Sequence, residues 1–159
     1  MIFEELVKLL KEKQLHLSAA ESCTGGLFMS SVIDIPGTSA IVDGSFVTYS
    51  AEMKTALVGV DPGIIEKYGV VSEEVAAEMA QGAAARTFSQ AAVGITGNAG
   101  PTLGDVSKEL GMVCFAAYLN GVTVTGTRYF EQMTRTEVRR AAAEHAAKML
   151  IERLENENC

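Results

Sequence analysis

Hydrophobic and polar positions along the chain repeat in blocks that predict helices and strands in alternation. Residues 2–13 place apolar side chains three and four positions apart, a spacing that indicates an amphipathic helix. Residues 15–21 then favour a short strand, and a pair of glycines opens a helix over residues 26–34. A second strand is predicted over residues 40–50, where β-branched and aromatic residues are frequent, and a helix over residues 51–59 follows it directly.

The same alternation continues through the middle of the chain. Ser72 is expected to cap a helix that extends towards Phe88, with two glutamates in its first turn. Residues 91–95 have the composition of a buried strand, and residues 96–111 follow as a long polar loop.

A hairpin and a long helix are predicted for the last part of the chain. The dipeptide Asn-Gly at 120–121 is a two-residue turn signal between residues 112–119 and 122–130, so those two strands should be antiparallel. Thr134 and Glu137 have the spacing of a capping box in front of a last helix. The expected inner stripe of that helix consists of Val138, Ala142, His145 and Met149.

Strands and helices in this order predict a three-layer α/β/α sandwich on a mixed β-sheet. A length of 159 residues is typical of one domain with one buried core, so we expect residues 1–159 to form a single domain. Ligands of such sheets gather at the carboxyl ends of the strands. Three polar segments directly follow predicted strands, namely residues 21–26, 49–54 and 96–105. We therefore expect a site where these segments meet.

The charge pattern argues against two classes of partner. Thirteen basic and twenty acidic residues give a net charge of -7, which disfavours binding to nucleic acid through neutralisation of phosphates. The first helix carries charges throughout, so it is neither a signal peptide nor a membrane span. We expect a soluble cytoplasmic protein without a membrane partner, and the sequence leaves open whether it is a monomer or a homo-oligomer.

Cysteine and histidine are too few and too scattered for a metal site. Three cysteines without paired spacing favour reduced thiols over a disulfide framework. His16 and His145 stand apart from cysteines and from closely spaced carboxylates, so no zinc site of known spacing is present in the sequence. We expect no metal and no cofactor.

Ser22 lies where a strand turns into a helix, in the segment "AESCTGGL". A serine in this position can expose its hydroxyl while the first N–H groups of the helix stay unpaired and available to an oxyanion. The alternative is that Ser22 or Thr24 caps the helix and that Gly25 and Gly26 only make the turn. Cys23 is a rival nucleophile, but no histidine is close to it in the sequence.

Two further candidates follow the second predicted strand. Lys54 can serve as a base if burial or a positive neighbour keeps it neutral, and Tyr49 can relay a proton if its hydroxyl is similarly perturbed. The alternative is a solvent-exposed helix lysine and an ordinary half-buried tyrosine. Neither residue belongs to a familiar short catalytic motif.

The segment "GITGNAGPTLGD" carries four glycines after a strand. Backbone N–H groups of such a loop can hold a phosphate, with Thr96 and Asn98 as additional donors, although the lysine of a P-loop is missing. The alternative is a surface loop that needs glycine for its turns. Similarly, Arg135, Arg139 and Arg140 crowd the start of the last helix, where an anion or a pairing of Arg140 with a glutamate would offset the unfavourable dipole.

Five segments together resemble one protein family in order and spacing across nearly the whole chain, namely "AESCTGGL", "GSFVTYSAEMKTALVGV", "YGVVSEEVAAEMAQGA", "GITGNAGP" and "RTEVRRAAAEHA". The family is the CinA C-terminal domain family, whose enzymes are nicotinamide mononucleotide deamidases. The resemblance implies a fold like that of anticodon-binding domains and hydrolysis of a nucleotide carboxamide to carboxylate and ammonia. Larger members carry an additional N-terminal domain, so we expect this chain to be the stand-alone form.

The resemblance also implies roles for single residues. Ser22 matches the serine nucleophile of the family, and Tyr49 and Lys54 match the polar pair that activates it. Glu21 is expected to orient the base or the cationic pyridinium ring. The expected substrate-binding residues are Glu21, Thr24, Gly25, Gly26, Thr96, Gly97, Asn98, Gly100 and Arg139.

One loop departs from the family pattern. Relatives commonly read Pro-x-Gly-Gly and then Lys-Pro-x-Gly-Thr, whereas residues 101–112 here read "PTLGDVSKELGM". Two other hypotheses therefore stay open beside the deamidase: a nucleotide-binding module of the same fold without turnover, and a hydrolase of a different amide.

Overall fold

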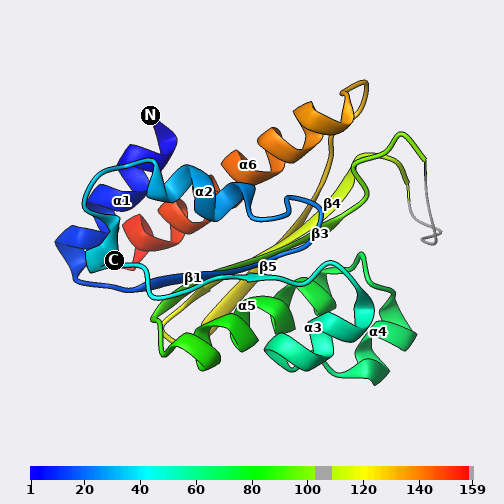
Figure 1. Ribbon diagram of the computed structural model, residues 1–159, viewed down its shortest axis with the longest axis horizontal. Helices are drawn as coiled ribbons and strands as arrows, with labels where there is room; N and C mark the ends of the chain where they lie inside the picture. The colour runs from blue at the N-terminus through cyan, green and yellow to red at the C-terminus, as the bar shows by residue number, and fades with distance from the viewer. Residues whose placement is uncertain (103–108, 158–159) are drawn as a thin grey trace.

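The computed structural model describes residues 1–102 and 109–157 of the chain, and its core is a five-stranded mixed sheet in the order β2-β1-β3-β4-β5 (Figure 1). Strands β2, β1 and β3 are parallel, whereas β4 is antiparallel to β3 and to β5. The strands are β1 (Leu17–Glu21), β2 (Phe46–Val47), β3 (Ala91–Gly97), β4 (Met112–Leu119) and β5 (Val122–Tyr129). The α-helices are α1 (Ile2–Lys13), α2 (Leu27–Ile33), α3 (Ala51–Val58), α4 (Pro62–Tyr68), α5 (Glu73–Thr87) and α6 (Arg135–Asn156).

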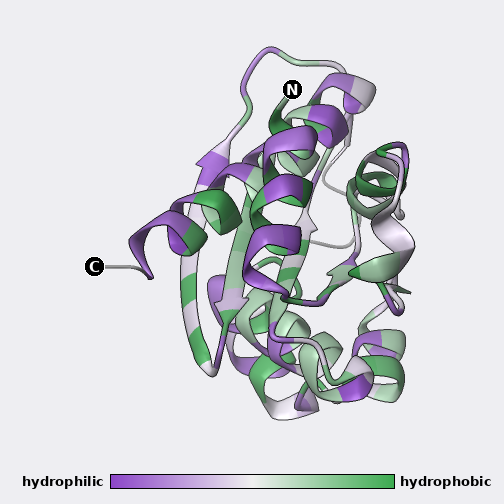
Figure 2. Cartoon of the chain, turned by 90° about the vertical axis from the view of Figure 1, so that its left-hand side faces the viewer, coloured by the Kyte–Doolittle hydropathy of each residue, from purple (hydrophilic) through white to green (hydrophobic). Residues whose placement is uncertain are grey.

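The helices cover both faces of the sheet, which makes the three-layer α/β/α sandwich that the sequence predicts (Figure 1). Helices α1, α2 and α6 lie on one face and enclose the larger apolar cluster, which includes Phe28, Phe115 and Leu150. Helices α3, α4 and α5 lie on the other face over a smaller cluster that includes Met79. Figure 2 shows hydrophilic positions on the outer helices and mainly hydrophobic positions along the strands between them.

Local signals in the sequence define most element boundaries. The Ser72 hydroxyl accepts a hydrogen bond from the Val75 N–H and so caps α5 as expected. Thr134 and Glu137 form the predicted capping box at the start of α6. The hairpin turn at 120–121 has positive φ at both residues, as a tight type I′ connection between β4 and β5 requires.

Two expectations about elements were wrong, and one was confirmed. The second strand was predicted over residues 40–50, but β2 covers only Phe46–Val47. Val42 adds an isolated parallel bridge to Leu17, and between the two paired stretches the Ser45 hydroxyl donates to the Ala19 carbonyl. Helix α4 was not predicted, although Asp61 caps it and Pro62 starts it. In α6 the predicted inner stripe is confirmed: Val138 and Ala142 are buried, Met149 packs against the core, and the His145 ring lies 4.6 Å from that of Phe115. The buried face is wider than this stripe and also includes Ala146, Ala147, Leu150, Ile151 and Leu154.

The topology brings three chain segments to one end of the sheet. Because β1, β2 and β3 are parallel, their carboxyl ends lie at the same edge, and the segments that follow them start there. The first turns of α6 reach the same end of the molecule (Figure 1). The expected meeting point of the polar segments therefore exists in the fold.

Candidate functional site

A pocket of about 570 Å³ opens at the carboxyl ends of β1 and β3, next to the start of α3. It lies at the point of the sheet where ligands of α/β folds usually bind. Its walls contain mixed polar and apolar side chains contributed by all three segments and by α6. The described lining residues are Ser22, Cys23, Tyr49, Ser50, Ala51, Glu52, Lys54, Val70, Val71, Thr96, Gly97, Asn98, Ala99, Thr102 and Arg135.

Ser22 and Lys54 are in direct contact inside this pocket. The Lys54 Nζ donates a hydrogen bond of 3.0 Å to the Ser22 Oγ, and a second one of 2.7 Å to the Thr48 carbonyl. Ser22 directly follows β1, and Lys54 lies in the first turn of α3. The contact therefore joins two residues that are 32 positions apart in the sequence. A hydroxyl held within hydrogen-bond reach of an amine is the geometry of a nucleophile and its base.

Burial makes Lys54 a usable base. Its side chain is 1% exposed, and this desolvation lowers its pKa from 10.5 to about 8. At pH 7 a fraction on the order of a tenth of the amine is then neutral, compared with less than a thousandth for an ordinary lysine. The interpretation of Lys54 as an exposed helix lysine is therefore wrong.

Ser22 does not act as a helix cap. Helix α2 begins after Gly26, which has positive φ, and no side chain caps it in the usual way. The buried Glu21 carboxylate instead accepts the N–H groups of Phe28 and Met29, at 2.8 and 3.0 Å. The expectation that the first helix N–H groups stay unpaired was wrong for these two, because Glu21 occupies them. Glu21 therefore anchors α2 from inside the fold and does not line the pocket.

Cys23 is a poor nucleophile in this environment. The side chain is 5% exposed, and desolvation raises the pKa of its thiol to about 12. The thiolate, which is the reactive form, is negligible near neutral pH. The geometry therefore favours the hydroxyl of Ser22 over the thiol beside it.

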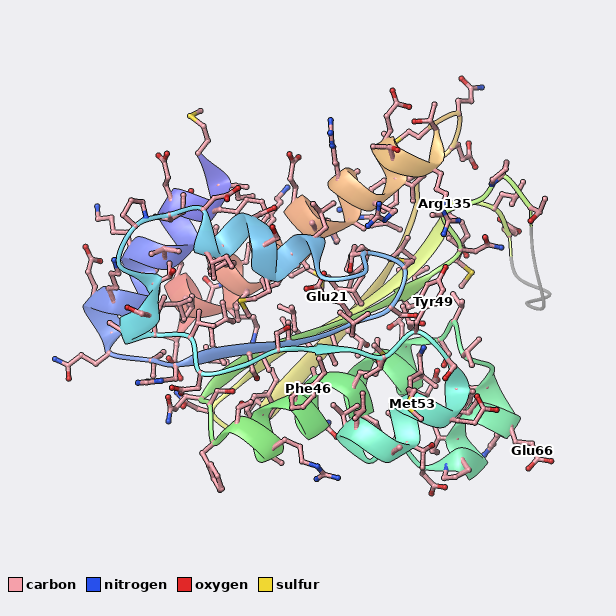
Figure 3. All side chains as sticks on the ribbon, viewed as in Figure 1. Glu21, Phe46, Tyr49, Met53, Glu66 and Arg135 are labelled. Carbon is pink, nitrogen blue, oxygen red and sulfur yellow. The ribbon has the colours of Figure 1, made fainter. Side chains whose placement is uncertain are left out.

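Tyr49 and Arg135 meet at the mouth of the pocket (Figure 3). The Arg135 Nη2 donates to the Tyr49 hydroxyl at 3.1 Å, and its Nη1 donates to the Gly100 carbonyl at 2.6 Å. Tyr49 is 65% exposed, so it is not the half-buried strand residue of the alternative interpretation. Arg135 is one of the three early arginines that the sequence offered as an anion site, although the expected substrate-binding residues included only Arg139 of these three.

The carboxyl end of β3 and the residue after it contribute three predicted residues to the pocket, which are Thr96, Gly97 and Asn98. The Thr96 hydroxyl donates to the Val70 carbonyl, and Asn98 accepts the Gly100 N–H through its side chain. Gly97 is required by packing, since a Cβ there would lie 2.8 Å from the Met112 carbonyl oxygen. Residues 103–108 of the altered loop lie outside the described residues, whereas Thr102 of the same segment lines the pocket.

Several residues that were predicted to contact the substrate do not line the pocket. Thr24 is fully buried, and Thr24, Gly25, Gly26, Gly100 and Arg139 are absent from the described lining. Arg139 binds the backbone carbonyls of Cys23 and Thr24 instead of facing the pocket. The lining also includes Ser50, Glu52 and Thr102, which lie in the predicted polar segments 49–54 and 96–105 but were not singled out. Val70 and Val71 were missed, since they belong to no motif and enter the pocket only through the fold.

Two searches of the described residues were negative. Residues 1–102 and 109–157 contain no group of three or more histidine, cysteine, aspartate or glutamate side chains arranged for a metal ion. Across the same ranges, no helix has the length and apolar character needed to cross a membrane.

Comparisons with known proteins agree along nearly the whole chain. The profile described as CinA C-terminal domain matches residues 1–154. A CinA-like protein of Chlorobaculum tepidum is 41% identical over 155 residues, which cover 95% of this chain and 37% of that protein. A CinA-like protein of Leptospira borgpetersenii serovar Hardjo-bovis is 38% identical over 154 residues, which cover 96% of this chain and 37% of that protein. The chain thus spans about a third of the length of the curated relatives it matches.

Solved structures share the fold over almost their full length. The competence/damage inducible protein CihA of Agrobacterium tumefaciens is 37% identical, with a TM-score of 0.88 and coverage of 98% of this chain and 96% of that one. A competence-damaged protein (CinA) superfamily protein of Klebsiella pneumoniae is 28% identical, with a TM-score of 0.93 and the same two coverages.

Proposed function

The chain belongs to the CinA C-terminal domain family, and from this premise we propose that it is an amidohydrolase that converts nicotinamide mononucleotide and water to nicotinate mononucleotide and ammonia, a step of pyridine nucleotide recycling. The observation that carries the proposal is the 3.0 Å contact between the Lys54 amine and the Ser22 hydroxyl inside a pocket. The choice of nicotinamide mononucleotide as the substrate is based on the family resemblance at Ser22, Tyr49 and Lys54.

In the first half of the reaction, neutral Lys54 takes the proton of the Ser22 hydroxyl as the oxygen attacks the carboxamide carbon. The resulting tetrahedral intermediate collapses when the C–N bond breaks. Lys54 returns its proton to the departing nitrogen, so ammonia leaves and an ester joins the nicotinoyl group to Ser22. The short distance between the two side chains supports direct transfer in both directions.

In the second half, water replaces ammonia. Lys54 removes a proton from the water, the hydroxide attacks the ester, and the Ser22 oxygen leaves with the proton that Lys54 returns. The net reaction consumes one water and releases one ammonia. Each step uses side chains of this chain, and none calls for a metal or a nucleoside triphosphate.

The charges around the pocket suit a nucleotide that has a cationic ring and an anionic phosphate. Arg135 supplies a guanidinium at the mouth, where it can bind a phosphate bidentately. Glu52 supplies a carboxylate on the α3 side of the pocket. Tyr49 lies beside Arg135, which supports a role as hydrogen-bond partner at the phosphate end more than as a proton relay to Ser22.

The test is incubation of purified protein with nicotinamide mononucleotide while ammonia and nicotinate mononucleotide are measured. Both products should appear in equal amounts, and Ser22→Ala should form neither. Binding without products would instead identify a nucleotide-binding module without turnover. Ammonia from other carboxamides but not from nicotinamide mononucleotide would identify a hydrolase of a different amide.

A further inference from the structure

Arg139 connects the last helix to the turn that carries Ser22. Its Nε donates to the Cys23 carbonyl at 3.0 Å and its Nη2 donates to the Thr24 carbonyl at 2.9 Å, across more than a hundred residues of chain. The guanidinium is half-buried behind the turn and is absent from the described lining of the pocket. These contacts differ from the substrate contact that the sequence predicts for Arg139.

The turn itself is built to receive this guanidinium. Gly25 has a φ of +59°, which favours glycine, and a Cβ added there would lie 3.4 Å from the Arg139 Nη2. Two carbonyls side by side match the planar fork of an arginine, whereas a lysine amine would act as a single point charge. The contact also places a cation near the start of α6, where the helix dipole disfavours it, and the two carbonyl dipoles offset that cost.

In addition to the contacts with Arg139, two backbone hydrogen bonds hold the chain at Ser22. The Ser22 N–H donates to the Ile95 carbonyl of β3 at 2.9 Å, and the Ser22 carbonyl accepts from the Gly25 N–H at 3.0 Å. In a planar trans peptide the N–H points opposite to the carbonyl. The N–H of Cys23 is therefore turned away from the inside of the turn, towards its own thiol, whose pKa burial raises and this contact lowers in part. Cys23 lines the pocket, so a substrate oxygen that reached this N–H would take the place of the thiol contact.

We propose that Arg139 is a positioning residue that locks the turn of residues 22–25, so that the Ser22 hydroxyl stays aimed into the pocket and the Cys23 N–H can receive the oxyanion. This inference rests on the proposed function for its substrate, but it also applies to any acyl transfer by Ser22. Arg139 acts through the two backbone carbonyls and does not touch the substrate. Binding of the substrate phosphate is then assigned to Arg135 alone of these two arginines.

The experiment compares Arg139→Met and Arg139→Lys with the neighbouring control Arg140→Met, whose wild-type arginine is exposed. Labelling of Ser22 by a fluorophosphonate, followed by intact-protein mass, measures the reactivity of the hydroxyl without any assumption about the natural substrate. The kcat and KM for nicotinamide mononucleotide are measured in parallel, and thermal melting verifies that each variant is folded at the assay temperature.

Arg139→Met should lower both the labelling rate and kcat by roughly 100-fold, the effect typical of a lost oxyanion donor, while KM changes by less than about threefold. Arg139→Lys should recover part of the loss, and Arg140→Met should match the wild type. If labelling persists in this pattern while nicotinamide mononucleotide is not hydrolysed, the positioning role stands and the proposed substrate is wrong.

Other outcomes would overturn the inference. A raised KM with normal labelling would make Arg139 a substrate ligand. A loss of labelling that only follows the unfolded fraction would make it a structural residue. Failure of the wild-type Ser22 to react with the probe would show that the turn does not activate the hydroxyl at all.

Discussion

Lys54 combines two demands that conflict in most proteins, since it is buried and yet has an ionisable amine. Two acceptors, the Ser22 hydroxyl and the Thr48 carbonyl, offset part of the desolvation cost. The remaining cost lowers the pKa of the amine to about 8. The burial that makes Lys54 a base should therefore also lower the free energy of unfolding by a measurable amount.

The first prediction concerns the pH dependence of the rate. Neutral Lys54 is the reactive form, so kcat/KM for nicotinamide mononucleotide should rise with pH, reach half its maximum near pH 8 and level off above it. The measurement is a set of initial rates between pH 6 and 10. A profile that is flat from pH 6 to 9 would exclude Lys54 as the general base.

The second prediction concerns the pH dependence of stability. The pKa of Lys54 is lower in the folded protein, about 8, than its ordinary value of 10.5, so between these values the unfolded chain holds a proton that the folded chain has released. The stability of the wild type relative to Lys54→Met should therefore rise through this window by roughly 1.4 kcal/mol per pH unit. Paired denaturant titrations at pH 7.5 and 10 measure it, and an unchanged difference would contradict the lowered pKa.

The third prediction tests whether Ser22 and Lys54 act as a unit. Each single variant, Ser22→Ala and Lys54→Met, should lose several orders of magnitude in kcat, and the double variant should lose little more. Cys23→Ser should stay active, because the buried thiol is protonated and takes no part. Multiplicative losses in the double variant, measured by single-turnover kinetics, would show that the two side chains work independently.

At the scale of elements, signals that act within a few residues were readable from the sequence, and signals that depend on distant partners were not. The caps at Ser72 and Thr134 and the hairpin at 120–121 are local, and each is confirmed. Strand β2 is shorter than predicted, and Ser45 beside it bonds to the Ala19 carbonyl, 26 residues away, a contact that no local pattern reveals. The Asp-Pro start of α4 was local and was overlooked.

The fourth prediction concerns the packing of α3, which carries Lys54, against α5. Gly82 lies in the interior of α5, where alanine normally stabilises a helix by about 1 kcal/mol over glycine. Here an added Cβ would lie 1.8 Å from the Val58 carbonyl oxygen at the end of α3. Gly82→Ala should therefore destabilise the protein by roughly 1–3 kcal/mol, which thermal or denaturant unfolding measures.

Ala85→Gly is the matched control in the same helix, because Ala85 is exposed. It should cost about 1 kcal/mol from propensity alone. Stabilisation by Gly82→Ala would contradict the close contact between the two helices.

At the scale of the whole molecule, the site is a product of topology. The sequence was sufficient to name Ser22, Tyr49, Lys54, Thr96, Gly97 and Asn98, which all line the pocket, because each directly follows or ends a parallel strand or starts the next helix. It was not sufficient to tell the role of Arg135 from that of Arg139, because both lie in the first two turns of α6. The two side chains lie on the same face of α6, one turn apart. Their different contacts depend on which segment each turn of the helix meets: Arg135 reaches Gly100, and Arg139 reaches the turn after Ser22.

The last prediction follows from this division of the arginines. Arg135 joins the start of α6 to Tyr49 and to the Gly100 carbonyl, so it holds three distant segments together around the pocket mouth. Arg135→Gln should raise KM for nicotinamide mononucleotide about tenfold or more and leave kcat nearly unchanged, because phosphate binding is lost equally in the ground and transition states. For the riboside without phosphate, the same substitution should change KM little. Steady-state kinetics with both substrates makes the comparison, and equal effects on the two would mean that Arg135 supports the shape of the mouth and does not bind the phosphate.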